Sequence, residues 1–130
     1  MLEKDIEKLF EKIKQDLIKS VFEKLPEEKN LDLAWCCLNN CELKIDPRAK
    51  SQLANMHLIL GKQKATCTVF YTEAGEELME IILTHELMHC VVNALYRRNM
   101  KHSKIFRDLG QKLTGKDRFV FAAKIKIEEY

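Results

Sequence analysis

The segment from Gly75 to Tyr96 constrains the fold more than any other part of this sequence, because it combines a long apolar helical pattern with side chains that bind metals. Glu76 and Glu77 stand at its start, where the positive end of a helix dipole stabilises negative charge. Steps of three and four residues separate the members of one face, which is the spacing of an α-helix. These members are Leu78, Ile82, His85, His89, Val92 and Tyr96. We therefore expect a helix here, with both histidines on its apolar face.

His85, Glu86 and His89 form an H-E-x-x-H motif within this helical pattern. Residues four apart are neighbours on one helix face, so two imidazoles can bind one metal ion while the intervening carboxylate stands beside an open coordination position. The competing interpretation is a pair of core histidines, each of which would need a buried hydrogen-bond partner. The motif favours a zinc site in which Glu86 works on a zinc-bound water.

A catalytic zinc site keeps three protein ligands and a water molecule, so a third ligand has to come from elsewhere in the chain. His102 is the best placed, because it follows His89 by 13 residues and lies beyond a polar stretch, 97–99, that can form a turn. A helix that ends near Tyr96 leaves His89 roughly 10 Å behind, a distance that the following residues up to His102 can recross. Rival third ligands are His57, Asp108, Glu128 and Glu129. Of these, His57 is more typical of a strand residue, and the last two of a charged tail.

Two stretches of the sequence resemble the SprT-like metallopeptidases, the family that includes Spartan-type proteases acting on proteins crosslinked to DNA. They are E-L-M-E-I-I-L-T-H-E-L-M-H and H-S-K-I-F-R-D-L-G, the second running from His102 to Gly110. The resemblance is strongest over roughly residues 65 to 110, and the order of predicted elements extends it more loosely. It implies a zincin-like peptidase with one zinc ion on His85, His89 and His102 and with Glu86 as the general base. The paired C-x-x-C motifs of the zinc ribbon found in many bacterial members have no counterpart in this sequence.

Helices are also predicted at the start of the chain and after the metal-binding segment. Apolar residues from Leu2 to Phe22 recur at helical spacing between lysines and glutamates, and Pro26 marks the end of that helix. Ser103 can N-cap a third-ligand helix that ends near Gly115. Residues 118–127 are typical of a strand.

A small sheet is predicted between residues 31 and 72. Alternating apolar residues and β-branched side chains favour three or four short antiparallel strands there, although 35–40 is also compatible with a helix. Residues 53–60 and 65–72 flank a loop of hairpin length. The second of these strands could be an edge that pairs with an extended substrate or an interior core strand. The predicted fold class is α+β: an N-terminal helix, this sheet, the H-E-x-x-H helix and the third-ligand helix, in one domain over residues 1–130.

Cysteine usage and hydropathy indicate a protein of a reducing compartment. Five cysteines are an odd number in a chain whose first residues do not form a secretory signal, so we expect reduced thiols and a cytoplasmic protein, or a nuclear one in a eukaryote. A membrane-spanning helix needs about 18 or more consecutive apolar residues, and no uninterrupted apolar run in this sequence approaches that length. Cys36, Cys37 and Cys41 lack a matching second half, so we interpret them as small hydrophobic residues and not as a second zinc site.

Charge is distributed unevenly along the chain. Residues 97–126 contain ten basic and two acidic side chains, a net of +8, whereas the whole chain carries +2. Such a segment can attract DNA or another polyanion, or it can be a solvated surface. The sequence therefore predicts a zinc-dependent metallopeptidase that hydrolyses peptide bonds in a protein or peptide substrate, including DNA-associated proteins. Two alternatives stay open: a non-catalytic zinc-binding module that docks nucleic acid or a protein partner through residues 97–126, and a small zincin with an acidic third ligand.

Overall fold

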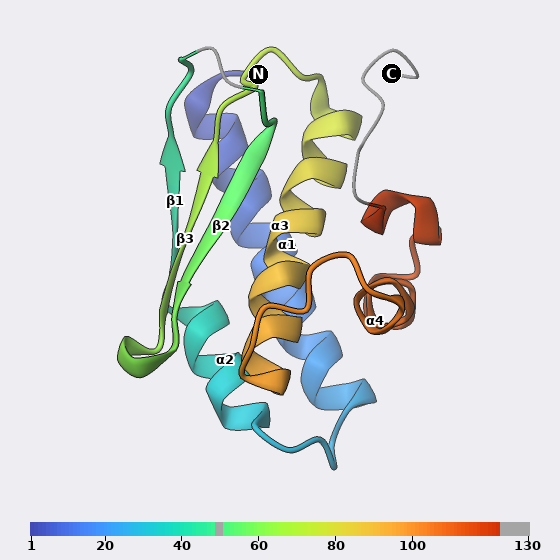
Figure 1. The fold of residues 1–130 in the computed structure, drawn as a ribbon. Helices are drawn as coiled ribbons and strands as arrows, with labels where there is room; N and C mark the ends of the chain where they lie inside the picture. The colour runs from blue at the N-terminus through green and yellow to red at the C-terminus, as the bar shows by residue number, and fades with distance from the viewer. Residues whose placement is uncertain (49–50, 123–130) are drawn as a thin grey trace.

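Helices pack against one face of a small sheet (Figure 1). The structure is a computed structural model and describes residues 1–48 and 51–122. Its helices and strands are α1 (Glu3–Lys24), α2 (Leu31–Asn39), β1 (Cys41–Ile45), β2 (Ala54–Ile59), β3 (Lys64–Val69), α3 (Glu76–Tyr96) and α4 (Lys104–Thr114), with the short 3-10 helices η1 (Leu60–Lys62) and η2 (Arg118–Phe121). The α+β fold class is confirmed.

The first helix follows the predicted pattern. Its buried stripe repeats at steps of three and four residues through Ile6, Phe10, Ile13, Leu17 and Val21. The helix ends at Lys24, two residues before Pro26, whose ring disfavours helical backbone in the residue before it.

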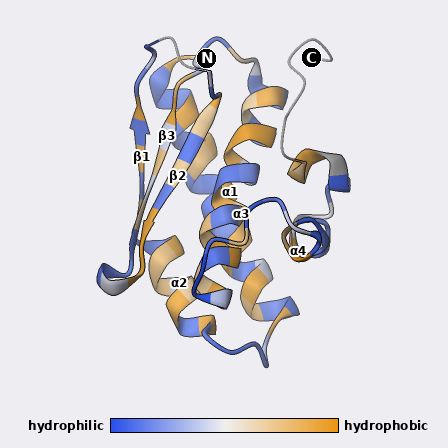
Figure 2. Ribbon diagram, in the orientation of Figure 1, coloured by the Kyte–Doolittle hydropathy of each residue, from blue (hydrophilic) through white to orange (hydrophobic). Residues whose placement is uncertain are grey.

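The segment with the H-E-x-x-H motif forms α3, the central helix of the fold (Figure 1). Hydrophobic residues extend along most of α3 (Figure 2), and its neighbours bury it on nearly every side. Among the described residues, α3 alone is long and apolar enough to cross a membrane, but 78% of its apolar window is buried within the fold. Such burial is the pattern of a core helix.

The sheet is mixed, which corrects the prediction of an antiparallel sheet. The strand order is β1-β3-β2, with β1 parallel to β3 and β2 antiparallel to β3. The hairpin of β2 and β3 is confirmed. Strand β3 lies between the other two, so the substrate-pairing edge considered for residues 65–72 is wrong and the interior-strand alternative is correct.

The strand interpretation of residues 31–35 is wrong, and the helical alternative for residues 35–40 is correct up to Asn39, because α2 occupies this segment. Leu31, Leu33 and Trp35 alternate with polar or small residues, but the buried positions of α2 are Ala34, Cys37 and Leu38. Those three follow helical spacing, and burial of their face against α3 determines the local structure. Leu31 and Leu33 pack only partly buried at the margin of the core, and Trp35 is exposed.

The segment after α4 differs from the predicted strand at residues 118–127. Residues 118–121 form η2, a single 3-10 turn that packs against α4 and α3. The turn buries Val120 and Phe121. Residues 123–127 lie outside the described part of the chain.

Candidate metal centre

Three histidines converge at the surface of α3. His85 and His89 lie one turn apart on α3, and His102 reaches them from the loop before α4. The Nε2 atom of His102 is 3.1 Å from that of His85 and 3.2 Å from that of His89, and the two α3 nitrogens are 3.2 Å apart. These residues form the only group of metal-ligand side chains found among the described residues. Such a cluster could bind a metal ion, and it contains all three predicted ligands.

A tight loop brings His102 back along α3. The helix ends where Arg97 adopts left-handed backbone with φ 54°, next to the predicted end at Tyr96. The amide N–H of Met100 then donates to Asn93 Oδ1 at 2.8 Å, which ties the loop to the last turns of α3. After the loop, Ser103 N-caps α4 by accepting a hydrogen bond from the Phe106 N–H at 3.3 Å. The N-cap and the helix limits predicted from the sequence are confirmed.

Packing and one hydrogen bond fix the orientation of the His85 and His89 rings. The Nδ1–H of His85 donates to the backbone carbonyl of Val120 at 2.8 Å, which leaves its Nε2 lone pair directed at the other histidines. The ring of Phe106 stacks on His89 with centroids 4.3 Å apart and an interplanar angle of 14°. Contacts within the fold therefore orient both rings.

Burial keeps the histidines neutral. Desolvation lowers the pKa of His85 to about 4, and desolvation together with the neighbouring imidazoles lowers that of His89 to about 3. Desolvation also lowers the pKa of His102. Neutral imidazoles offer lone pairs at physiological pH, so metal binding at His85 and His89 would not have to displace protons from them.

Glu86 lines the same pocket as the three histidines. This pocket has a volume of about 550 Å³ and also includes β2 residues 54–56 and the loop residues Asn99 and Lys101. Burial raises the pKa of Glu86 to about 7, because an ionised carboxylate is poorly solvated there. A carboxyl group that titrates near neutrality beside a possible metal site is suited to acid–base chemistry.

The two rival ligands that the structure describes, His57 and Asp108, do not join the cluster. His57 is exposed on β2 and does not line the pocket. Asp108 forms ion pairs with Arg118 and Lys104 and does not line the pocket. Glu128 and Glu129 lie outside the described residues.

Several participants escaped the sequence prediction. Asn93, which holds the loop, is four residues after His89 and could have been found from this spacing. Phe106 stacks on His89, but its place on the apolar face of α4 gave no sign of that contact. The Val120 carbonyl lies 35 residues from His85, and no local pattern could reveal it.

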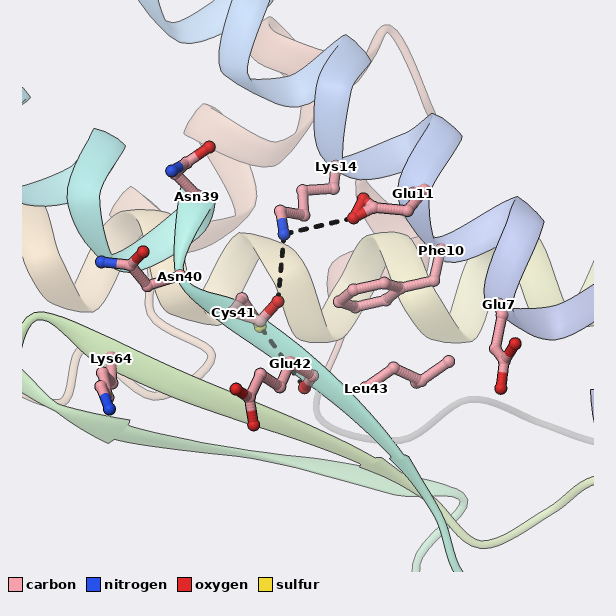
Figure 3. Close-up of a pocket in the computed structure, with 10 residues that line it drawn as sticks. All are labelled: Glu7, Phe10, Glu11, Lys14, Asn39, Asn40, Cys41, Glu42, Leu43 and Lys64. Atoms are coloured by element: carbon pink, nitrogen blue, oxygen red, sulfur yellow. Dashed lines mark hydrogen bonds and ion pairs between the residues drawn. The ribbon is translucent and has the colours of Figure 1, made fainter. Parts of the chain in front are cut away.

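A second pocket of about 600 Å³ lies away from the histidines, between α1, the end of α2 and the start of β1 (Figure 3). Its buried ammonium group belongs to Lys14, which donates to the Cys41 carbonyl at 3.1 Å and to Glu11 Oε1 at 3.3 Å. Burial raises the pKa of the Cys41 thiol to about 12, so this sulfur stays protonated. The Lys14 ammonium group is therefore satisfied by neighbouring groups of the fold.

Comparison of the chain with protein-family models, with curated proteins and with solved structures finds no match. The resemblance to SprT-like metallopeptidases consequently rests on the motif residues alone. The geometry contributes a separate observation, namely three convergent histidines and a carboxyl group of raised pKa in one pocket.

Proposed function

We propose that the protein is a zinc-dependent peptidase, with zinc held by His85, His89 and His102. The observation that carries the proposal is the Nε2 triangle, whose sides measure 3.1, 3.2 and 3.2 Å. A tetrahedral zinc site with Zn–N bonds of 2.0–2.1 Å has ligand nitrogens about 3.3 to 3.4 Å apart, close to this spacing. Imidazole nitrogen is also a ligand that zinc accepts readily. A set of three ligands beside a pocket is typical of catalytic sites, whereas structural sites have four.

Glu86 supplies the acid–base chemistry in this proposal. When bound, zinc would lower the pKa of a water molecule and polarise a substrate carbonyl. A carboxylate oxygen of Glu86 accepts a proton from this water molecule, and Glu86 then donates the proton to the leaving amine. Burial raises the pKa of Glu86 to about 7 in the metal-free protein, and a nearby zinc ion would favour the ionised carboxylate that accepts a proton.

An unpaired strand edge in the pocket supports a peptide substrate. In the order β1-β3-β2, strand β2 is at the edge of the described sheet, and its residues 54–56 line the pocket with the histidines. An extended peptide can add to such an edge through backbone hydrogen bonds. This edge takes the role that the sequence had allowed for residues 65–72.

Peptide hydrolysis by the purified full-length chain, loaded with one equivalent of zinc, tests the proposal. We expect cleavage of an unstructured protein such as casein, and Glu86→Gln should retain zinc but lose at least 100-fold in rate, because an amide cannot accept the proton. His57→Ala is the matched control, since it removes a histidine that lies outside the pocket. Wild-type hydrolysis by Glu86→Gln would contradict the mechanism. Zinc binding without hydrolysis would favour the binding-module alternative.

The second candidate, a zinc-binding module that docks a polyanion, is favoured by exposed basic residues beside the pocket. Within residues 97–122, Lys116 pairs with Glu80, while Lys104 and Arg118 pair with Asp108. The exposed residues Arg97, Arg98 and Lys101 stand on the loop that carries His102, beside the pocket. We propose that this loop is where DNA would bind, in either candidate function. The cytoplasmic or nuclear location remains a prediction from the sequence.

A further inference from the structure

The backbone carbonyl of Val120 holds His85 by a contact that spans the chain. Val120 belongs to η2, a four-residue turn, and its oxygen accepts the Nδ1–H of His85 at 2.8 Å. A histidine that donates from Nδ1 has its lone pair on Nε2, the atom that faces His89 and His102. The position of η2 therefore fixes which nitrogen of His85 is available to a metal.

The place of η2 is in turn fixed by a close contact between Phe121 and Gly110. Phe121 is fully buried, and its ring packs against Phe106 with centroids 5.8 Å apart. A Cβ atom placed on Gly110 would lie 2.5 Å from Cδ2 of Phe121, far inside van der Waals contact. Gly110 lies within the helix α4, where glycine weakens the helix by about 1 kcal/mol relative to alanine. The glycine is thus needed for the approach of the ring and not for the backbone of α4.

Two ion pairs reinforce this docking. Lys116 Nζ donates to Glu80 Oε1 on α3 at 2.9 Å, and Arg118 pairs with Asp108 on α4. These pairs connect the segment that carries Val120 to α3, which bears His85 and His89, and to α4, which follows His102.

We propose that Gly110 and Phe121 are positioning residues of the metal centre. By admitting the Phe121 ring, Gly110 lets η2 place the Val120 carbonyl, which holds His85 in the tautomer and orientation that bind metal. Coupling of this kind is reciprocal, so metal binding also strengthens the docking of η2. The inference rests on the proposed metal site but not on peptidase activity.

Zinc affinity of Gly110→Ala, measured by competition with a chromophoric chelator, tests the proposal. We expect a loss of about 10- to 100-fold, the usual effect of disturbing a group that orients a metal ligand. Gly61→Ala is the matched control, because nothing lies within 4 Å of a Cβ at that glycine. Alanine favours helix, so weaker zinc binding in a variant with native circular dichroism cannot be attributed to loss of α4. Wild-type affinity in folded Gly110→Ala would overturn the proposal.

Two further measurements keep the test decisive if Gly110→Ala does not fold. Phe121→Leu removes the ring without adding volume, and an unchanged zinc affinity in this variant would overturn the proposal as well. Trypsin cleavage after Lys116 or Arg118 should be slowed by zinc in the wild type and in Gly61→Ala, and less so in Phe121→Leu. Zinc that leaves wild-type cleavage unchanged contradicts the coupling. Hydrolysis is assayed separately, so a wild type that binds zinc without cleaving casein would defeat the peptidase proposal alone.

Discussion

The raised pKa of Glu86 predicts a specific pH dependence of stability in the metal-free protein. Burial raises this pKa from 4.5 to about 7, so the folded state binds the Glu86 proton more tightly than the unfolded state does. The resulting stabilisation is fully present below about pH 4.5 and is lost as the pH rises through about 7. Between these limits the shift corresponds to about 3 kcal/mol of unfolding free energy, at 1.36 kcal/mol per unit.

Glu86→Gln should abolish this loss of stability at rising pH, because an amide does not ionise. The difference in unfolding free energy between the variant and the wild type should grow in favour of the variant by about 3 kcal/mol between pH 4.5 and pH 8. Urea denaturation in the presence of a chelator, followed by circular dichroism at several pH values, measures the difference. His85 and His89 act in the opposite direction, since their lowered pKa values weaken the fold as the pH falls below about 6.5. Both proteins contain these histidines, so their effect cancels in the comparison.

Glu42→Gln, which removes an exposed carboxylate from β1, controls for the change in net charge. A stability difference between Glu86→Gln and the wild type that stays constant from pH 4.5 to pH 8 would refute the burial argument. Saturating zinc should reduce the change of this stability difference with pH, because a nearby cation stabilises the ionised carboxylate.

Three more outcomes are expected. His102→Ala should lose zinc at concentrations that saturate the wild type and His57→Ala, as measured by metal analysis after dialysis; undiminished zinc would remove His102 from the site. Replacement of Arg97, Arg98 and Lys101 together should reduce the slope of log DNA affinity against log salt by roughly 2 to 3 if each contacts a phosphate, and an unchanged slope in a fluorescence titration would leave the loop a solvated surface. Ser103→Ala, which removes the N-cap of α4, should lower the unfolding free energy by about 1 kcal/mol in urea denaturation, whereas a neutral result would mean that water satisfies the Phe106 N–H equally well.

The elements that could be predicted from the sequence are those with a local physical cause. Helix α3, its end next to Tyr96 and the Ser103 cap follow from side-chain periodicity and helix-end chemistry within a few residues. The approach of His102 to His89 could be anticipated because the intervening chain is short. Prediction failed for the first half of α2, where three apolar residues alternate as in a strand although the buried face has helical spacing, whereas the helical alternative for residues 35–40 was correct.

Contacts distant in sequence explain the remaining differences. Strand β3 lies between β1 and β2 and pairs in parallel with β1. The partner of β1 therefore follows β2 in the chain, and the local sequence of β1 gives no sign of this pairing. Glycine at position 110 lowers the helix propensity of α4, which from the sequence alone is only a weakness. The structure shows that the missing side chain of this glycine leaves room for the Phe121 ring. The ligands of the proposed metal centre can therefore be predicted from their spacing in the sequence. The Val120 carbonyl that orients His85 cannot, because its position depends on where η2 packs. A second chain with the same H-E-x-x-H motif and third histidine but a bulky residue at the position of Gly110 would need a different acceptor for the first histidine.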